Sequence, residues 1–235
     1  MSKPKPPAPG DIPDMTTFLA SSVHDMKNSV SLLINGLQKT LGSVSPENFP
    51  GYGDLAQMTY EAKRINNNLV QLLTLYKLDQ QLYPFDSRQV AVDEFFRSVA
   101  DQTSGLLQSQ GVVLEFEAAP DLYWYFDEDL VSGVIGNAFN NAIRYTKDRV
   151  RLSARLVDGL LELAIEDNGS GYSAEMLEQS RDALRGVNFQ SGSTGLGLYF
   201  SASVAKLHKN RGRCGAIRLE NGGPFGGGCF VLTLP

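Results

Sequence analysis

Residues 131–146 read Val-Ser-Gly-Val-Ile-Gly-Asn-Ala-Phe-Asn-Asn-Ala-Ile-Arg-Tyr-Thr. On a helix with 3.6 residues per turn, Asn137, Asn141 and Arg144 share one face. Asparagine is a poor helix former, whereas an ordinary solvent-exposed helix face would use lysine or glutamate. Such an exposed face stays the alternative interpretation of this segment. Amide oxygens can coordinate Mg²⁺ beside phosphate, and arginine can pair with phosphate oxygens. The segment, expected to be a helix from about Glu128 to Tyr145, is a candidate phosphate-binding element.

A second polar motif follows a predicted strand at residues 166–171, Glu-Asp-Asn-Gly-Ser-Gly. Gly169 and Gly171 let the backbone adopt positive φ and approach a planar ligand closely. The carboxylate of Asp167 can accept a hydrogen bond from an exocyclic amine. Ordinary turns use the same residues, so this motif alone leaves a plain turn open.

A third motif, residues 191–198, reads Ser-Gly-Ser-Thr-Gly-Leu-Gly-Leu and leads into a predicted helix near 196–208. Backbone N–H groups around Thr194, Gly195, Leu196 and Gly197, together with the helix amino terminus, suit a di- or triphosphate.

In this order and spacing the three motifs resemble the ATP-binding domain of the GHKL superfamily, and specifically that of bacterial sensor histidine kinases. The resemblance covers residues from about 92 to 235 and includes the glycine turn at 222–228. It implies that Asn141 holds Mg²⁺, Asn137 supports the phosphates of ATP and Arg144 faces phosphate. It further implies that Tyr145 lies near the adenine and that Asp167 binds the adenine amino group, with Gly169 and Gly171 shaping that pocket. Residues 173–194, which contain Asn188-Phe189, take the place of the family's ATP lid.

The amino-terminal part has a different pattern. Apolar residues from Leu19 to Leu37 and from Leu55 to Tyr76 recur every three or four positions, separated by a break at 42–51. This heptad spacing predicts two helices in an antiparallel hairpin. A lone hairpin cannot bury apolar seams on both helices, whereas two hairpins form a four-helix bundle. We therefore expect a homodimer through residues 14–80.

The hairpin carries a candidate nucleophile, His24, which the heptad register places on the outward face with Asn28. Asp25 can accept the imidazole N–H proton, which makes the other ring nitrogen a better nucleophile. A lone surface histidine is usually only solvated. Beside an ATP domain, however, His24-Asp25-x-x-Asn28 resembles the histidine kinase phosphoacceptor motif. The resemblance makes His24 the phosphoacceptor and Asp25 its acid/base partner, and it places Asn28 where such kinases orient water for phosphatase chemistry.

The expected fold is α+β and multidomain. Residues 1–13 form a flexible tail, 14–82 the dimerisation and phosphotransfer hairpin, and 83–235 an ATP-binding α/β sandwich with helices on one face of a sheet of antiparallel strands. Within the sandwich we expect a helix at 92–107 and strands at 112–116, 122–125, 149–157, 160–166, 216–219 and 229–234. Asp158-Gly159 is a two-residue hairpin signal.

Composition narrows the function classes. The chain has 235 residues, 21 basic against 26 acidic, a net charge of −5, two histidines and two cysteines. No apolar window is long enough to span a bilayer, and the mild acidity disfavours nucleic-acid binding. The cysteines lack metal-ligand spacing and are expected to be buried thiols in a reducing cytoplasm. His208, at the end of a predicted helix, is expected to carry partial positive charge there.

The resemblance therefore implies an ATP-dependent protein histidine kinase that phosphorylates His24 and passes the group to an aspartate of a separate response regulator receiver domain. It further implies phosphatase activity on that regulator. The alternative is a histidine phosphotransfer protein or pseudokinase scaffold that binds a regulator without using ATP. The chain is either a short cytosolic kinase or the catalytic fragment of a longer protein.

Overall fold

The computed structural model describes residues 15–45, 47–183 and 195–235. The chain divides into two compact units between Tyr83 and Pro84, and each is described by itself. No helix in the described ranges is long and apolar enough to cross a membrane.

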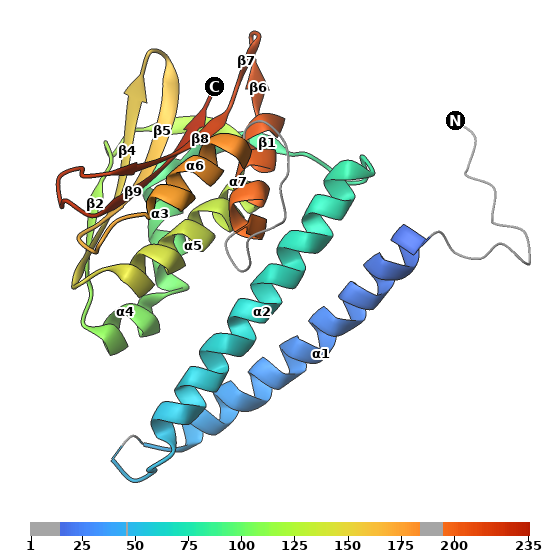
Figure 1. The fold of residues 1–235 in the computed structure, drawn as a ribbon, viewed down its shortest axis with the longest axis vertical. Coiled ribbons are helices and arrows are strands. Elements are labelled where there is room, and N and C mark those ends of the chain that lie inside the picture. Colours follow the sequence, from blue (N-terminus) through green and yellow to red (C-terminus); the bar gives the residue numbers. More distant parts are fainter. Residues whose placement is uncertain (1–14, 46, 184–194) are drawn as a thin grey trace, which may run out of the picture. The chain divides into compact units, whose positions relative to one another are not determined.

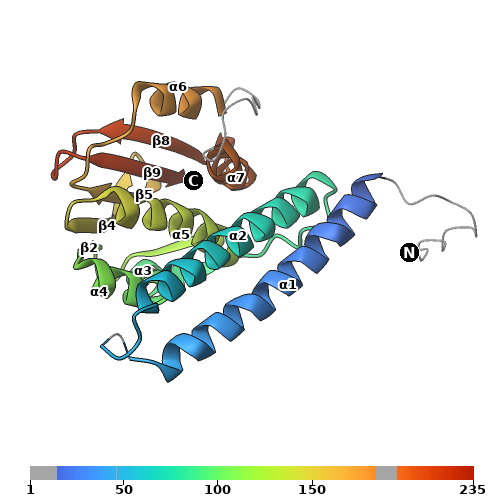
Figure 2. The ribbon, with the colours of Figure 1, turned by 60° about the horizontal axis from the view of Figure 1, so that its bottom comes forward.

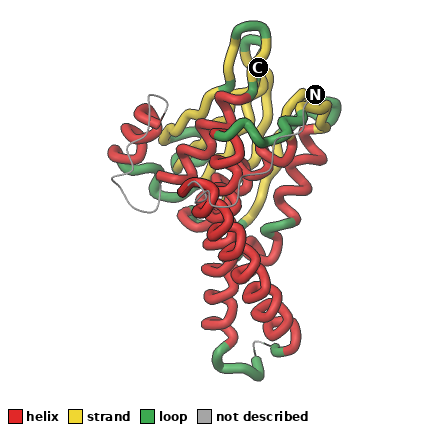
Figure 3. Tube along the Cα trace, turned by 90° about the vertical axis from the view of Figure 1, so that its right-hand side faces the viewer, coloured by secondary structure: helices red, strands yellow, loops and turns green. Residues whose placement is uncertain are grey.

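The first unit is a helical hairpin. Helix α1 spans Met15–Ser43 and α2 spans Tyr52–Asp79, and Figure 3 shows them lying side by side and joined at one end by a short loop. Half-buried or buried residues repeat at heptad spacing along the contact, including Val23, Val30 and Ile34 on α1. Between the helices, the Ser31 hydroxyl donates to Asn66 Oδ1 at 3.2 Å. The predicted hairpin is confirmed.

Each helix of the hairpin leaves an apolar stripe exposed. On α1 the side chains of Leu19, Met26 and Leu33 are 55%, 55% and 57% exposed, and on α2 Met58, Ile65 and Leu72 are 59%, 48% and 43% exposed. Within each helix these residues are seven apart, so they line one face. The single hairpin therefore buries only part of the predicted heptad positions.

The second unit is built on a five-stranded sheet, ordered β2-β4-β5-β9-β8. The strands are β2 (Val113–Glu117), β4 (Arg149–Val157), β5 (Leu160–Asp167), β8 (Ala216–Asn221) and β9 (Gly228–Leu234). Its neighbours are antiparallel except β2 and β4, which run parallel. A smaller sheet pairs β1 (Ser87–Ala91) with β3 (Tyr123–Asp127), and β6 (Lys209–Asn210) pairs with β7 (Arg213–Cys214).

The helices of this unit are α3 (Val92–Asp101), α4 (Ser104–Gln110), α5 (Glu128–Tyr145), α6 (Ala174–Ala183) and α7 (Gly195–Leu207). In Figure 1, α5 and α6 lie in front of the sheet strands. Figure 2 shows the same elements with the bottom of that view turned toward the viewer. Sheet residues such as Leu163, Ile165 and Leu232 are fully buried, as are Ile135 and Phe139 of α5. Nearly every residue of β5 and β9 is buried.

The other face of the sheet is charged. Arg155 and Arg218 both bind Glu162, whose side chain is only 9% exposed, and Arg151 binds Glu166. The Arg155–Glu162 and Arg151–Glu166 pairs join β4 to the neighbouring β5, whereas Arg218 reaches Glu162 from β8 across β9. Ala164, Cys229 and Val231 form a small buried apolar cluster on β5 and β9. Buried carboxylates are tolerated here because each has a cationic partner.

Several expectations need correction. The helix predicted at 92–107 is two helices, because the hydroxyls of Thr103 and Ser104 donate to the carbonyls of Ala100 and Asp101 and end α3. Strands β1, β6 and β7 and helix α6 were missed, since they are short or carry no clean periodicity. The strands are not all antiparallel, since α5 lies between β2 and β4 in the chain and returns it to the same end. Cys214 is exposed, not buried.

His208 has a structural role, but not the charge expected. It is 4% exposed, its Nε2 accepts from the backbone N–H of Asp127 at 3.1 Å, and its Nδ1 lies 2.8 Å from the carbonyl of Val204. Nδ1 must therefore carry the one proton of a neutral ring. Burial lowers the pKa of His208, against smaller opposing effects of that carbonyl and Asp127. The helix-dipole expectation was wrong because burial outweighs it.

Candidate functional site

The carboxylate of Asp167 is fixed at the end of β5. Its Oδ1 accepts backbone hydrogen bonds from Gly169 at 2.7 Å and Gly228 at 3.2 Å, and the residue is 6% exposed. Among the described residues, Oδ2 has no hydrogen-bonding partner. A buried carboxylate with one oxygen held and the other available is suited to accept from a ligand amine.

Glycine is required around this carboxylate. A Cβ on Gly169 would lie 2.1 Å from the carbonyl oxygen of Tyr145, and one on Gly227 would lie 2.6 Å from Oδ1 of Asp167. Three segments therefore meet here: the end of α5, the end of β5 and the turn between β8 and β9. The carbonyl of Tyr145 thus lies beside Gly169, and Tyr145 is 58% exposed.

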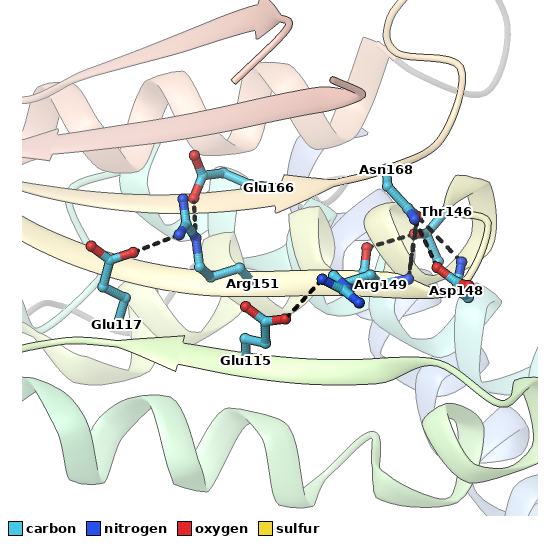
Figure 4. A network of polar contacts seen from close by, with 8 residues as sticks. All are labelled: Glu115, Glu117, Thr146, Asp148, Arg149, Arg151, Glu166 and Asn168. Atoms are coloured by element: carbon cyan, nitrogen blue, oxygen red, sulfur yellow. Dashed lines mark hydrogen bonds and ion pairs between the residues drawn. The ribbon is translucent and has the colours of Figure 1, made fainter. Parts of the chain in front are cut away.

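Asn168 joins the end of β5 to the connection between α5 and β4. Its Oδ1 accepts from the Thr146 hydroxyl at 2.7 Å and from three successive backbone N–H groups, at residues 147, 148 and 149. Its Nδ2 donates to the Asp148 carboxylate at 2.7 Å. Figure 4 shows this cluster beside the Arg151–Glu166 pair. Asn168 thus fixes the residues that follow Tyr145.

Asn221 performs a similar task for the turn after Gly169. Its side chain accepts from the backbone N–H of Tyr172 at 2.7 Å and donates to the carbonyl of the same residue at 2.8 Å. Gly171 adopts φ of +76°, and a Cβ there would lie 2.7 Å from Asn221 Oδ1. Burial, with a smaller contribution from the Asp167 carboxylate, raises the pKa of the Tyr172 hydroxyl, which stays protonated.

The polar face of α5 meets the amino terminus of α7. A Cβ on Gly197 would lie 2.5 Å from Asn137 Nδ2, so the absence of a side chain lets these helices approach. Asn137 is half-buried, whereas Asn141 and Arg144 are exposed on the same helix. The Arg144 guanidinium stacks on Tyr145 at 5.5 Å. Backbone N–H groups of Gly195, Leu196 and Gly197, in the first turn of α7, lie on that helix's positive end.

The hairpin presents His24 to solvent, with its side chain 59% exposed. Asn28 Nδ2 lies 3.4 Å from His24 Nδ1, and Asp25 Oδ1 lies 3.6 Å from the same nitrogen. Both neighbours therefore gather at Nδ1 and leave Nε2 on the open side of the ring. The predicted outward face is confirmed.

The structure thus brings Asp167, Gly169 and Tyr145 together, and separately Asn137 and Gly197. Thr194 and Asn188-Phe189 lie outside the described residues. Sequence reasoning missed Asn168, Asn221, Gly227 and Gly228 as positioning residues. Asn168, Gly227 and Gly228 lie inside the quoted motifs and Asn221 directly precedes the glycine turn. Asparagine and glycine are so common in turns, however, that nothing local marked their long-range contacts.

Comparison with known proteins agrees with this geometry. Residues 126–235 match the family model described as Histidine kinase-, DNA gyrase B-, and HSP90-like ATPase. The chain is 27% identical over 200 residues to the phosphate regulon sensor protein PhoR of Pseudomonas aeruginosa, which covers 83% of the chain and 45% of PhoR. It is 24% identical over 224 residues to the sensor protein SrrB of Staphylococcus aureus, covering 93% of the chain and 37% of SrrB.

Solved structures share the fold. The Acinetobacter baumannii histidine kinase AdeS aligns with a TM-score of 0.59 and 20% identity, covering 90% of this chain and 96% of that one. Full-length ShkA, solved with AMPPNP, aligns with a TM-score of 0.65 and 17% identity, covering 94% and 46%. Together, the family match, the relatives and the shared fold support a sensor histidine kinase catalytic core. It spans less than half the length of these two curated relatives.

Proposed function

We propose that the chain is an ATP-dependent protein histidine kinase that phosphorylates its own His24. One observation carries the proposal: an exposed histidine, with a carboxylate at its Nδ1, lies in the same chain as an ATPase domain of the histidine kinase class. A phosphotransfer protein or pseudokinase would not need Asp167 held with one oxygen available, nor the close approach of Gly197 to Asn137.

In the nucleotide site, Asp167 Oδ2 accepts a hydrogen bond from the adenine amino group. Gly169 and Gly171 have no side chains and so leave room for the base. Tyr145 lies beside the adenine. Asn137, Arg144 and the first turn of α7, at Gly195, Leu196 and Gly197, face the phosphates, with Thr194 just before it. The positive end of a helix and a guanidinium both favour an anion at this place.

Mg²⁺ fits the donor set on α5, because the exposed Asn141 offers an amide oxygen and hard oxygen donors are what this ion prefers. Asn141 would hold the ion together with phosphate oxygens, and the ion would neutralise charge on the phosphates during transfer.

At the acceptor, His24 Nε2 attacks the γ-phosphorus of ATP. The new N–P bond forms as the bond to the bridging oxygen breaks, and ADP leaves. Asp25 takes the Nδ1 proton, which keeps the attacking nitrogen's electron pair available. The phosphoryl group then passes to an aspartate of a response regulator receiver domain in another chain. Asn28, beside His24, orients water for dephosphorylation of that regulator.

The proposal further includes a homodimer through residues 14–80 and a cytoplasmic location. The exposed stripes at Leu19, Met26 and Leu33 and at Met58, Ile65 and Leu72 support the dimer, since a second hairpin would cover them in a four-helix bundle. In the division proposed, residues 1–13 are a tail, 14–82 the hairpin domain and 83–235 the ATP-binding domain.

The test is incubation with γ-labelled ATP and Mg²⁺. Acid-labile, base-stable label should appear on the wild-type chain and be lost in His24→Ala, while that variant still binds nucleotide. Asn141→Asp and Asp167→Asn should lose both labelling and nucleotide affinity while remaining folded. Label that persists in His24→Ala would remove His24 from its role, and absence of nucleotide binding by the wild type would favour the pseudokinase scaffold.

A further inference from the structure

The turn between β8 and β9 is anchored to β4 by an aromatic side chain. The guanidinium carbons of Arg151 and Arg149 lie 5.1 Å and 5.6 Å from the ring centroid of Phe225. Both distances fall inside the range of about 6 Å in which a cation is attracted to an aromatic face. Phe225 is half-buried by these contacts.

The two arginines are themselves fixed. Arg151 Nε binds Glu166 at 2.8 Å and its Nη1 binds Glu117 at 2.7 Å, leaving the side chain 18% exposed. Arg149 Nη1 lies 3.5 Å from Glu115, and its backbone N–H is held by Asn168. Figure 4 shows the Arg151 guanidinium between Glu117 and Glu166 and the Arg149 guanidinium beside Glu115. The ring therefore packs on a preorganised cationic surface.

The turn needs such an anchor because its own composition gives it little rigidity. Residues 222–228 are five glycines, one proline and Phe225. Gly222, Gly223 and Gly226 adopt positive φ, and glycine loses more conformational freedom on ordering than any other residue. Phe225 is the one large side chain in the turn.

The far end of the same turn touches the candidate adenine acceptor. The backbone N–H of Gly228 donates to Asp167 Oδ1 at 3.2 Å. A Cβ on Gly227 would lie 2.4 Å from the carbonyl oxygen of Asp167, and one on Gly228 would lie 2.8 Å from its Oδ2. Any shift of the turn therefore moves one of the two donors that orient the carboxylate.

We propose that Phe225, packed on Arg149 and Arg151, is a positioning residue that holds the glycine turn in place and thereby sets the orientation of Asp167 toward adenine. The inference rests on the proposed function, because it takes Asp167 as the adenine acceptor. Phe225 would not touch the nucleotide; its effect would pass through Gly227 and Gly228.

Phe225→Leu keeps an apolar side chain but removes the aromatic face. The dissociation constant for ADP should rise about three- to tenfold, as expected for loss of a partly desolvated cation–π contact. Inosine diphosphate lacks the exocyclic amine that Asp167 would read, so its affinity should change little. The preference for ADP over inosine diphosphate should therefore fall by about the same factor. Phe225→Tyr, which retains the ring, should preserve that preference.

Phe116→Leu is the matched control. Phe116 also packs beneath an arginine, with the Arg97 guanidinium carbon 5.7 Å from its ring centroid. It lies on β2, however, and in the described part of the chain it forms no ring contact with the β8–β9 turn. It should leave the nucleotide preference unchanged. A preference that is unaltered in Phe225→Leu, or that falls equally in Phe116→Leu, would overturn the inference.

A second measurement separates this inference from the proposed function. In the nucleotide-free chain, hydrogen exchange of the Gly228 amide should be faster in Phe225→Leu than in the wild type and unchanged in Phe116→Leu. Unchanged exchange in Phe225→Leu would also overturn the inference, whatever the nucleotide results. If Asp167→Asn did not weaken ADP binding, the assignment of Asp167 as the adenine acceptor would be refuted. The exchange rate of the Gly228 amide would still decide whether Phe225 holds the turn in place.

Discussion

In the second unit, single glycines allow close contacts because they lack a side chain, and a single side-chain oxygen accepts several hydrogen bonds. Gly197 leaves room for Asn137, and Gly169 leaves room for the carbonyl of Tyr145. Oδ1 of Asn168 accepts from four donors, so one oxygen organises a whole connection. The buried, neutral His208 caps the backbone N–H of Asp127, whose own side chain caps α5.

Gly197→Ala tests the space beside Asn137. The added Cβ would lie 2.5 Å from Asn137 Nδ2 and must displace that amide from the phosphate end of the site. We expect ADP affinity to fall about tenfold, equivalent to about 1.4 kcal/mol, with the fold retained. Isothermal titration of ADP measures it. Gly136→Ala, where a Cβ meets open space, is the control and should bind normally.

The pKa of His208 gives a pH prediction. Because burial lowers this pKa, the unfolded chain binds a proton more readily than the folded one. The stability contributed by the neutral ring is therefore present above the unfolded pKa of about 6.5 and is lost as pH falls toward the folded value.

Urea unfolding at pH 7.5 and pH 5.5 checks this prediction. The wild type should lose more stability between these pH values than His208→Gln, which can still accept from Asp127 N–H but cannot be protonated. All other ionisable groups are common to the two proteins. Equal losses in the two proteins would contradict the prediction.

At the scale of elements, the ends of secondary structures are where the site is assembled. The end of α5, the end of β5 and the β8–β9 turn converge on Asp167, and the start of α7 meets α5 at Asn137. These junctions are held by side chains rather than by sheet or helix hydrogen bonds. Asn168 and Asn221 each tie two segments that are distant in the sequence.

Asn168→Ala should destabilise the domain, because it leaves the backbone N–H groups of Lys147 and Asp148 without their acceptor, while that of Arg149 keeps only the Thr146 hydroxyl. We expect a loss of about 1–3 kcal/mol in the free energy of unfolding, as for unsatisfied polar groups of this kind. Chemical denaturation followed by circular dichroism measures it. The exposed neighbour Ser170, changed to alanine, should cost far less, and a similar cost for both would argue against the role of Asn168.

At the scale of the whole molecule, the hairpin has more apolar surface than its own two helices cover. The exposed stripes on α1 and α2 repeat every seven residues, which is the spacing of a helix seam that packs on further helices. A second copy of the chain supplies such helices.

Charge placed on the stripes should therefore separate the dimer. Leu33→Glu and Ile65→Glu, whose side chains are 57% and 48% exposed in one chain, should shift the chain from dimer to monomer in sedimentation equilibrium at micromolar concentration. Lys39→Glu, a charge change at an exposed α1 residue off the stripe, should remain dimeric. A wild type that sediments as a monomer would refute the proposed dimer.

Patterns local in the sequence determined much of this protein. Heptad spacing predicted both hairpin helices, the Asp158-Gly159 signal predicted the β4–β5 hairpin, and the asparagine-rich segment predicted α5 with its ends at Glu128 and Tyr145. Such patterns work because helix faces, strand alternation and two-residue turns are set by neighbours within a few positions.

Only the tertiary structure decided which distant groups meet. Nothing near Phe225 in the sequence indicates that Arg149 and Arg151 lie against its ring, and nothing near His208 indicates that Asp127 donates to it. Burial then reversed the charge expected for His208, because desolvation depends on what packs around a residue rather than on its place along a helix. The sequence alone determined the motifs and most of the longer helices and strands, while the fold decided the contacts that orient them.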